Sequence, residues 1–425
     1  MRLIRTKGRS AQEAEAVIVV LERRGGTALD SVLPSVRRIV TAVRGGGDRA
    51  LIRFARQFDG LQDPDRLRVS PDEMKAAWHA VDAELRQALS IAAKQIRGFA
   101  RKQLPRSWSS TPFPGLSTGQ LVRPLASVGC YVPSGRHPLP STLLMTAIPA
   151  KVAGVERVVV VSPRPAPATL AAAHLLGIAE FYRIGGAHAV AAMAYGTENF
   201  PRVEKIVGPG NLYVTAAKRL VAFDCAIDML AGPTEIVVTS VLGRAGDIAL
   251  DLVAQAEHDP QALAILITPH EDLAGEVISK VKQLGRNNAI AREALGRNGL
   301  AIVASTEKEA RELTNRIAPE HLTVDRADDL EWVRSAGSVF VGRWSAQPMG
   351  DYISGPNHTL PTGGTARVRG GLSVNDFLKI ITVQEYDLKG LRALGPKAAL
   401  LADAEGLFGH AAAIRTRLQK VRSLD

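Results

Sequence analysis

Short, unbroken apolar runs alternate with alanine-rich helical segments through the middle of the chain, and this alternation limits the fold more than any other feature. Val158–Val161 is such a run, and Ser162-Pro163 ends it. A run of this kind is typical of a strand buried on both faces of a parallel sheet. A helix is predicted next at residues 168–176, followed by a strand at 181–184. A second helix is predicted from 187 and a further strand at 205–207. This βαβ pattern predicts a doubly wound α/β domain.

The same alternation returns later in the chain. Strands are predicted at 236–241, 263–267 and 300–303, and helices at 247–257, 271–284 and from 307. We therefore expect an α/β protein with two doubly wound, Rossmann-like domains of related topology. We expect an N-terminal arm at residues 1–30 and a first, discontinuous α/β domain at 31–130 with 234–375. A second α/β domain is expected at 131–233, and a small helical C-terminal extension at 376–425.

Two segments between these units carry local signals. Ser70 suits a helix N-cap, Pro71 the first helical position, and Glu73 the third position of a capping box. The apolar residues from 74 to 99 step by three or four and predict one long helix. Residues 104–119 are rich in Pro, Ser and Gly and predict a loop.

Charge and cysteine content restrict the class of function. The chain has 53 Lys and Arg against 42 Asp and Glu, so its net charge of +11 permits anion binding. The basic residues are scattered and aromatics are only 5%, which argues against nucleic acid as a partner. Two cysteines form no disulfide framework. We find no signal peptide or membrane span, and expect a cytoplasmic protein without a membrane partner.

The first histidine of chemical interest lies at the end of a predicted helix. His258 lies three positions after Gln255, so the two share one helix face, and Asp259-Pro260 ends the helix. An amide oxygen and an imidazole are suitable ligands for a divalent metal ion. The alternative is an ordinary capped helix end.

Three further strings pair a carboxylate with an imidazole. Glu320-His321 supplies two adjacent proton-transfer groups, unless this dipeptide is only a turn. A loop fixed by Gly and Pro carries Asp351 and His358, which it can aim into one site. A fourth string near the C-terminus carries Glu405 and His410.

The glycine signals are less specific. The chain has neither a P-loop nor an intact G-x-G-x-x-G string. Gly185-Gly186 and Gly208–Asn211 each follow a predicted strand and precede a helix, where a nucleotide meets helix N-termini in a doubly wound fold. Tight turns explain these glycines equally well. Cys130 is a candidate thiol nucleophile, but no neighbour in sequence lowers its pKa.

Taken together, these strings resemble the histidinol dehydrogenase family over roughly residues 30–420. The strings that carry the resemblance are Tyr131-Val132-Pro133, Gly185-Gly186-Ala187, Ile206–Asn211, Ile227–Glu235 and the Gln255–His258 string. The resemblance implies one Zn²⁺ per subunit and NAD as cofactor. It implies oxidation of L-histidinol to L-histidine through a bound histidinaldehyde, a four-electron reaction that uses two NAD⁺ and ends histidine biosynthesis.

The resemblance also assigns residues. His321 takes the hydroxyl proton and Glu320 activates water. The implied zinc ligands are Gln255, His258, Asp351 and His410. The implied substrate contacts are Thr234, Gln255, His258, His321, Asp351, His358, Glu405 and His410. The implied cofactor contacts are Tyr131, His188 and Asn211. The family forms homodimers, so we expect active sites shared between subunits, with the C-terminal extension reaching across.

Three positions depart from the usual family strings. His188 stands where the family usually has Gln, Thr234 where it has Ser, and Ser134 where a second Gly is common. One imidazole cannot offer both the donor and the acceptor of an amide. The departures keep a second interpretation open, a paralogue that oxidises a different small alcohol. Two other classes are a zinc hydrolase and a non-catalytic basic binding protein.

Overall fold

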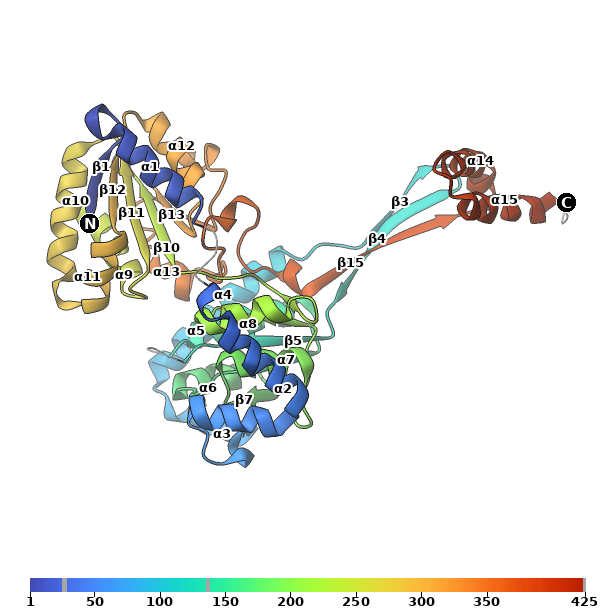
Figure 1. Cartoon of the computed structure of the whole chain (residues 1–425), viewed down its shortest axis with the longest axis horizontal. Helices are drawn as coiled ribbons and strands as arrows, with labels where there is room; N and C mark the ends of the chain where they lie inside the picture. The colour runs from blue at the N-terminus through green and yellow to red at the C-terminus, as the bar shows by residue number, and fades with distance from the viewer. Residues whose placement is uncertain (25–28, 135–137, 423–425) are drawn as a thin grey trace. The chain divides into compact units, whose positions relative to one another are not determined.

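The structure, a computed structural model, describes residues 1–24, 29–134 and 138–422. The chain divides into two compact units, drawn with their elements labelled in Figure 1. Unit 1 comprises Met1–Gln103 and Leu125–Phe377, and unit 2 comprises Leu104–Pro124 and Leu378–Asp425. Residues 25–28 of the expected N-terminal arm and residues 423–425 of the expected C-terminal extension lie outside the described residues.

Sheet A of unit 1 has six parallel strands in the order β1-β12-β11-β10-β13-β14. Its strands are β1 (Arg2–Arg5), β10 (Glu235–Thr239), β11 (Leu263–Thr268), β12 (Leu300–Val303), β13 (His321–Val324) and β14 (Ser338–Val341). Ile236 and Val238 pack on one face, against α9 (Ala245–Ala256), α10 (Glu271–Leu284) and α11 (Ala289–Asn298). Val237 packs on the other face, against α1 (Ala11–Glu22) and α12 (Glu307–Ile317). Both faces are buried, which is why β10 reads as a continuous apolar run.

Sheet B, also in unit 1, has the order β2-β7-β6-β5-β8-β9, with only β2 antiparallel. Its strands are β2 (Arg68–Val69), β5 (Ser127–Tyr131), β6 (Arg157–Val161), β7 (Glu180–Tyr182), β8 (Lys205–Val207) and β9 (Ala226–Ile227). One face is covered by α2 (Leu33–Phe54), α7 (Gly186–Tyr195) and α8 (Leu212–Val221). The other is covered by α5 (Pro140–Ala153), with α6 (Pro167–Leu175) packed beside it.

The two sheets share one topology, as the sequence predicted. Counted from β10 in sheet A and from β5 in sheet B, the first five strands lie in the order 3-2-1-4-5. In each sheet a strand from earlier in the chain is added beside the third strand, β1 in sheet A and β2 in sheet B. The prediction of two doubly wound, Rossmann-like folds of related topology is confirmed.

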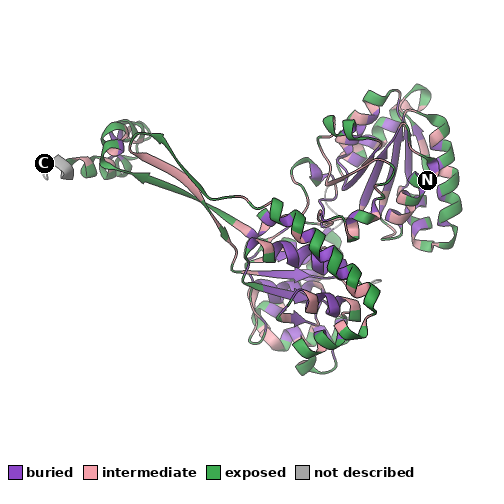
Figure 2. Cartoon of the chain, turned by 180° about the vertical axis from the view of Figure 1, so that it is seen from behind, coloured by how far each residue is buried: buried purple, intermediate pink, exposed green. Residues whose placement is uncertain are grey.

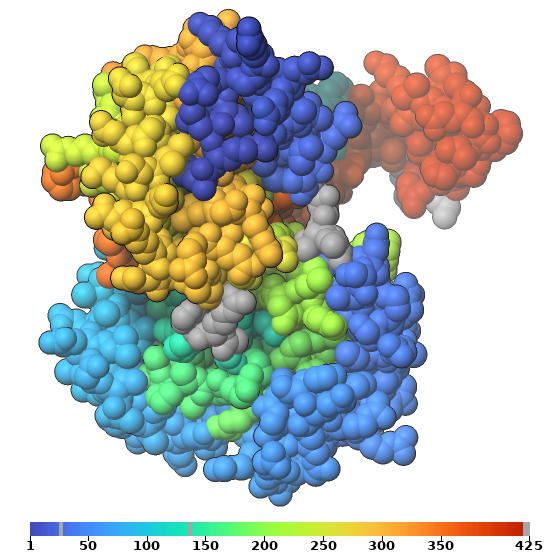
Figure 3. All heavy atoms as spheres, turned by 60° about the vertical axis from the view of Figure 1, so that its left-hand side comes forward, coloured from blue at the N-terminus to red at the C-terminus, as the bar shows by residue number. Residues whose placement is uncertain are grey.

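The grouping of the N-terminal segments differs from the expected division. The arm was expected to stand apart, but β1 pairs with β12 and α1 packs on α12, and Figure 3 shows these dark blue residues against the yellow and orange segments. Helix α2, expected to join residues 234–375, packs instead on α7 and α8 of sheet B. Amphipathic periodicity shows which side of a helix is apolar, but it does not say which sheet covers that side.

Two local predictions are corrected. Ser70 does cap a helix, accepting the Glu73 N–H at 3.1 Å, but this helix, α3 (Pro71–Ala80), is short. Asp82 caps a new helix, α4 (Ala83–Lys102), because the backbone at Val81 is extended. The prediction of a single long helix is therefore wrong. The loop predicted at 104–119 is also wrong, because it contains β3 (Trp108–Phe113) and the start of β4 (Leu116–Pro124).

Unit 2 is a three-stranded antiparallel sheet followed by two helices. Strand β15 (Leu378–Tyr386) pairs with β4, which pairs with β3. The helices are α14 (Leu388–Ala404) and α15 (Phe408–Arg422), so the extension is helical only after β15. Every residue of β3 and nearly every residue of β15 is exposed, in contrast to the buried strands of unit 1 (Figure 2).

Among the described residues, no helix has both the length and the apolar character needed to cross a bilayer. The expected cytoplasmic location stays a prediction.

Candidate active site

The candidate catalytic pair lies at the amino ends of two neighbouring strands of sheet A. Strands β10 and β13 run parallel, and Ile236 is paired in register with His321. The residues just before β10 therefore lie beside Glu320 and His321 at the start of β13. Backbone pairing alone brings together groups that are 85 or more positions apart in sequence.

Glu320 is a buried carboxylate with two donors. Its Oε2 accepts the Thr234 hydroxyl and the Glu235 backbone N–H, both at 2.7 Å. Burial raises the pKa of Glu320 to about 7, although the positive charge of His321 and these two donors oppose the rise. A carboxyl group with a pKa near neutrality can both accept and return a proton at physiological pH.

His321 presents one bonded and one free nitrogen. Its Nδ1 lies 3.0 Å from the Glu235 carbonyl oxygen, which only accepts, so Nδ1 carries the proton of the neutral ring. Its Nε2 has no hydrogen-bond partner, and Asp351 Oδ1 lies 3.8 Å away. Burial works to lower the pKa of His321, but the negative charges of Glu320 and Asp351 outweigh it and raise the pKa to about 9. Nε2 is therefore the ring nitrogen without a hydrogen-bond partner, and it is a free base only in the neutral ring, the major form above about pH 9.

Thr234 links Glu320 to Gln255. The Thr234 hydroxyl that donates to Glu320 accepts a short hydrogen bond from Gln255 Nε2. This fixes the amide orientation and leaves Gln255 Oε1 buried without a donor. A buried acceptor without a donor is rare in folded proteins and calls for a ligand or an ion.

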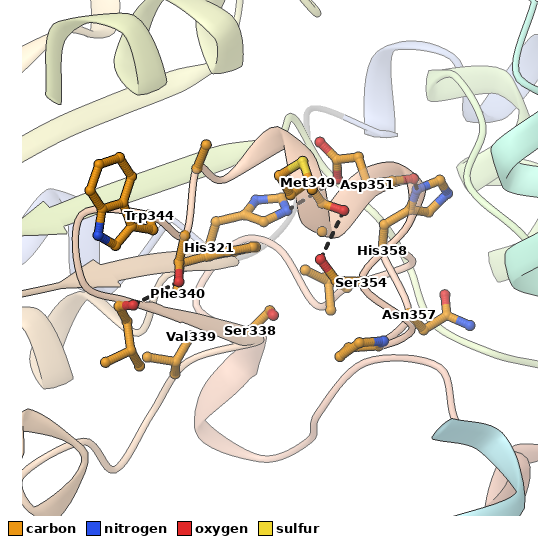
Figure 4. A pocket seen from close by; sticks show the side chains of 16 residues that line it. His321, Ser338, Val339, Phe340, Trp344, Met349, Asp351, Ser354, Asn357 and His358 are labelled. Carbon is orange, nitrogen blue, oxygen red and sulfur yellow. Dashed lines mark hydrogen bonds and ion pairs between the residues drawn. The ribbon is translucent and has the colours of Figure 1, made fainter. Parts of the chain in front are cut away.

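Asp351 and His358 come together at one pocket, as the sequence suggested. Asp351 lies in a short helix, α13 (Pro348–Tyr352), and its backbone oxygen accepts from His358 Nδ1 at 2.9 Å. Burial would raise the pKa of Asp351, but His321, His358 and His258 together lower it. Burial lowers the pKa of His358 below its ordinary value. Figure 4 shows these groups on the wall of a cavity of about 380 Å³, with Phe340, Trp344 and Met349.

The remaining expected ligands are placed differently. Helix α9 ends at Ala256, so His258 lies beyond it and does not share a helix face with Gln255. His258 is exposed, and it lies near enough to Asp351 to contribute to the lowered pKa of that carboxyl. Glu405 and His410 are exposed residues of unit 2. Within the described ranges, no three or more His, Cys, Asp or Glu side chains are grouped to hold a metal ion.

The expected cofactor residues lie at the carboxyl edge of sheet B. Tyr131 ends β5, and its hydroxyl accepts the Gly186 N–H at 3.0 Å. Burial raises the pKa of Tyr131 to about 12, so the hydroxyl keeps its proton. Asn211 caps α8 by accepting the N–H groups of Tyr213 and Val214. Strands β5 and β8 are neighbours at the point where the strand order reverses, the usual ligand site of an open α/β sheet.

His188 is held inside the protein. It is 1% exposed, and its Nε2 lies 2.7 Å from Asp59 Oδ2. The same oxygen accepts the Gly185 N–H at 3.0 Å. The ring therefore helps to fix the Gly185-Gly186 turn through Asp59, and a direct cofactor contact stays a prediction.

Gly208 is fixed from both sides. Asp228 Oδ2 accepts its N–H at 2.7 Å, and Lys218 Nζ donates to its carbonyl oxygen at 3.0 Å. Lys218 and Asp228 also form a short, buried ion pair. At φ +113° and with an added Cβ only 2.2 Å from the Tyr131 carbonyl oxygen, this position accepts only glycine.

Cys130 is excluded as a nucleophile. It is completely buried in β5, and burial raises the pKa of its thiol to about 12. The reactive thiolate form is therefore absent at neutral pH.

The sequence profile of the histidinol dehydrogenase family matches residues 22–418. The chain belongs to the histidinol dehydrogenase family. Histidinol dehydrogenase from Methanothermobacter thermautotrophicus is 46% identical over 413 residues, covering 94% of this chain and 96% of that protein. The enzyme from Geobacillus kaustophilus is 46% identical over 418 residues, covering 93% and 98%. A crystal structure of histidinol dehydrogenase from Elizabethkingia anophelis matches with a TM-score of 0.92 at 35% identity, over 99% of each chain.

Membership of this family makes the chain an oxidoreductase that acts on a small molecule, and it implies a role in histidine biosynthesis. The hydrolase and the non-catalytic binding protein are therefore set aside.

The site also contains residues to which sequence reasoning gave no role. Gln347 Nε2 donates to Asp351 Oδ2 at 3.1 Å, and Arg24 binds Glu235. Nothing in their sequence neighbourhoods indicates either contact.

Proposed function

We propose that the chain oxidises L-histidinol to L-histidine through a bound histidinaldehyde, with Zn²⁺ and two NAD⁺. The observation that carries the proposal is the arrangement at the amino edge of sheet A. There a buried carboxylate with a raised pKa, a histidine with a free Nε2 and an amide oxygen without a donor lie around one network. This supports proton transfer next to a cation, in a chain that belongs to an alcohol-oxidising family.

The side chains at hand fit a zinc ion. Gln255 Oε1 and Asp351 supply oxygen ligands, and His258 supplies nitrogen from the turn after α9. We propose His410 of a second subunit as the fourth ligand. A mixed set of two nitrogens and two oxygens suits a borderline cation. When bound, zinc polarises the substrate oxygen and NAD⁺ accepts the hydride.

The chain's own residues then have separate tasks. In its neutral form His321 takes the hydroxyl proton of the alcohol on Nε2, because Nδ1 is held by the Glu235 carbonyl. Glu320 takes a proton from the water that hydrates the aldehyde, and Thr234 keeps its carboxylate in place. His358 and the partner's Glu405 are proposed to orient the substrate. Tyr131, His188 and Asn211 are proposed around the cofactor at the carboxyl edge of sheet B.

The stoichiometry of turnover tests the proposal. We expect about two NADH formed per histidinol consumed, because each of the two oxidations releases one hydride. A ratio near one, with free aldehyde, would contradict the four-electron course. NADH from another small alcohol but none from histidinol would favour the paralogue.

We also propose that the enzyme is a homodimer with shared sites. The support comes from unit 2, whose sheet and helices expose many large apolar side chains. They include Ile380, Ile381, Val383, Tyr386, Leu400, Leu401 and Phe408. A three-stranded sheet needs a covered apolar face to be stable, and in one subunit β3 and nearly all of β15 are exposed.

Subunit mixing tests this arrangement. His258→Asn and His410→Asn should each lose zinc and activity together. Refolding the two variants together should restore about a quarter of wild-type activity, because half of the dimers are mixed and each carries one intact site. No recovery in a mixture that forms mixed dimers would contradict shared sites.

A further inference from the structure

One arginine from the N-terminal segment contacts both the segment that leads into the catalytic pair and the neighbouring strand β10. Arg24 follows α1 and lies 211 positions before Glu235, yet its guanidinium binds the Glu235 carboxylate in a fork. Nε donates to Oε1 and Nη2 donates to Oε2, both at 2.7 Å. The side chains are 13% and 5% exposed, so solvent screens this pair little.

The other donors of Arg24 reach the backbone. Nη1 donates to the Ile317 carbonyl at 2.7 Å and makes a short bond to the Leu21 carbonyl. Nη2 also donates to the Ala318 carbonyl at 3.4 Å. All five guanidinium N–H groups therefore have acceptors, and these acceptors come from three separate parts of the chain.

The Ala318 contact lies next to the catalytic residues. Ala318 has φ +52°, the only positive φ of a non-glycine residue in the described chain. This conformation is disfavoured for a residue with a Cβ, and it turns the chain from α12 into Pro319-Glu320-His321. Arg24 donates to the carbonyls of Ile317 and Ala318 at this turn and so fixes the position from which the chain continues to Glu320 and His321.

Glu235 holds the same two residues from the other side. Its N–H donates to Glu320 Oε2, and its carbonyl accepts from His321 Nδ1. Its carboxylate accepts from Arg24 and from the Gly363 N–H at 3.0 Å. The backbone groups of one residue therefore contact both members of the catalytic pair, and its side chain is fixed by Arg24.

We propose that Arg24, acting through Glu235 and the Ala318 turn, is a positioning residue that sets the relative geometry of Glu320 and His321. The kinetic part of this proposal rests on the proposed function. Arg24 touches neither substrate nor cofactor in it. Because small errors in the placement of reacting groups slow chemistry more than they weaken binding, the loss should appear in kcat.

The matched test compares Arg24→Met with Arg316→Met. Arg316 of α12 also bridges to α1, through Glu15 and Glu22, but it does not contact Glu235. Arg24→Met should lower Tm more than Arg316→Met, because it leaves the buried Glu235 carboxylate without its cation, whereas Arg316 and its partners are partly exposed. Arg24→Met should lower kcat by about 30- to 100-fold with both KM values within about threefold, and Arg316→Met should leave kcat unchanged. A kcat within about threefold of wild type in folded Arg24→Met would overturn the proposal.

Conservative replacement and chemical rescue separate positioning from general stability. Arg24→Lys should recover less than about a tenth of the lost kcat, because one ammonium cannot make the fork and reach the carbonyls. Methylguanidinium should raise the kcat of Arg24→Ala about fivefold or more, and methylammonium should not. Equal rescue by both cations would mean that Arg24 acts only through its positive charge, and this would overturn the proposal. If the Arg24 variants fail to fold, Glu235→Gln takes their place, and an unchanged kcat there overturns it.

A second measurement is independent of turnover. Amide hydrogen exchange across residues 234–236 reports the Glu235 N–H that donates to Glu320. Arg24→Met should raise this exchange rate about tenfold or more over Arg316→Met. Unchanged protection would overturn the positioning role. If wild type forms no NADH, the proposed function fails, and exchange still decides the role of Arg24.

Discussion

Sheets A and B share one strand order but present their candidate groups at opposite edges. In sheet B the glycine turns and Tyr131 lie at the carboxyl ends of the strands, where open α/β sheets usually bind ligands. In sheet A the Glu320–His321 pair lies at the amino ends of β10 and β13. Strand order thus defines a place for a ligand, and side chains decide whether that place is used.

The residue after the fourth strand explains the difference. In sheet B this residue is Gly208, which lets the backbone approach Tyr131 closely. In sheet A it is Asp325, whose carboxylate accepts the Ser240 hydroxyl and the N–H groups of Val241 and Leu242, at 2.6–2.8 Å. Backbone N–H groups that could receive an anion in sheet A are therefore already bound by the chain's own carboxylate.

The largest effect should come from the amino edge of sheet A. Glu320→Gln keeps the acceptor oxygen for Thr234 and Glu235 but cannot take a proton. Oxidation of the aldehyde should slow by about 10²–10⁴-fold, and oxidation of the alcohol by less than about tenfold. Single-turnover NADH formation from histidinol and from histidinaldehyde measures the two halves. Equal losses in both halves would contradict a water-activating role.

The pH dependence of the same step gives a second measurement. Because burial raises the pKa of Glu320 to about 7, the carboxylate is the major form only above that pH. The aldehyde half should therefore lose activity as pH falls, about tenfold per unit below the pKa. Glu320→Gln should show no such limb. A limb that persists in the variant would assign the titration to another group.

A smaller effect should come from the carboxyl edge of sheet B. Gly208→Ala brings a Cβ against the Tyr131 carbonyl and should raise the KM for NAD⁺ by about 10- to 100-fold. Gly177→Ala is the matched control, because Gly177 also has a positive φ but its Cβ position meets only the flexible Lys151 Nζ, at 4.0 Å. The control should leave this KM unchanged. An unchanged KM in folded Gly208→Ala would break the assignment of the cofactor to sheet B.

The smallest kinetic effect is expected at the carboxyl edge of sheet A. Asp325→Ala leaves three donors without their acceptor and should lower the free energy of unfolding by about 2–4 kcal/mol. Thermal unfolding measures this loss, while kcat and the KM for NAD⁺ should stay within about twofold. Asp247→Ala, which breaks an exposed ion pair with Arg343 in the same cavity, should cost at most about 1 kcal/mol. A raised KM for NAD⁺ in Asp325→Ala would mean that both sheets take part in cofactor binding.

Local patterns in the sequence predicted the elements well where both faces of a strand are buried. Val158–Val161 and its neighbours gave strands at the expected places, and Ser70 gave a helix start. Predictions were less accurate where structure depends on distant partners. The Pro- and Ser-containing strand β3 exists through its pairing with β4, and β1 through its pairing with β12.

By itself the sequence determined two α/β sheets of one topology, the Glu320–His321 pair and the strings that identify the family. Only the tertiary structure decided that the candidate pair lies at the amino edge of sheet A, that Asp325 binds the backbone N–H groups at the other edge, and that Arg24 contacts Glu235. The physical reason is that periodicity and motifs report neighbours within a few residues. Hydrogen bonds across 85 to 293 positions depend on how whole elements pack.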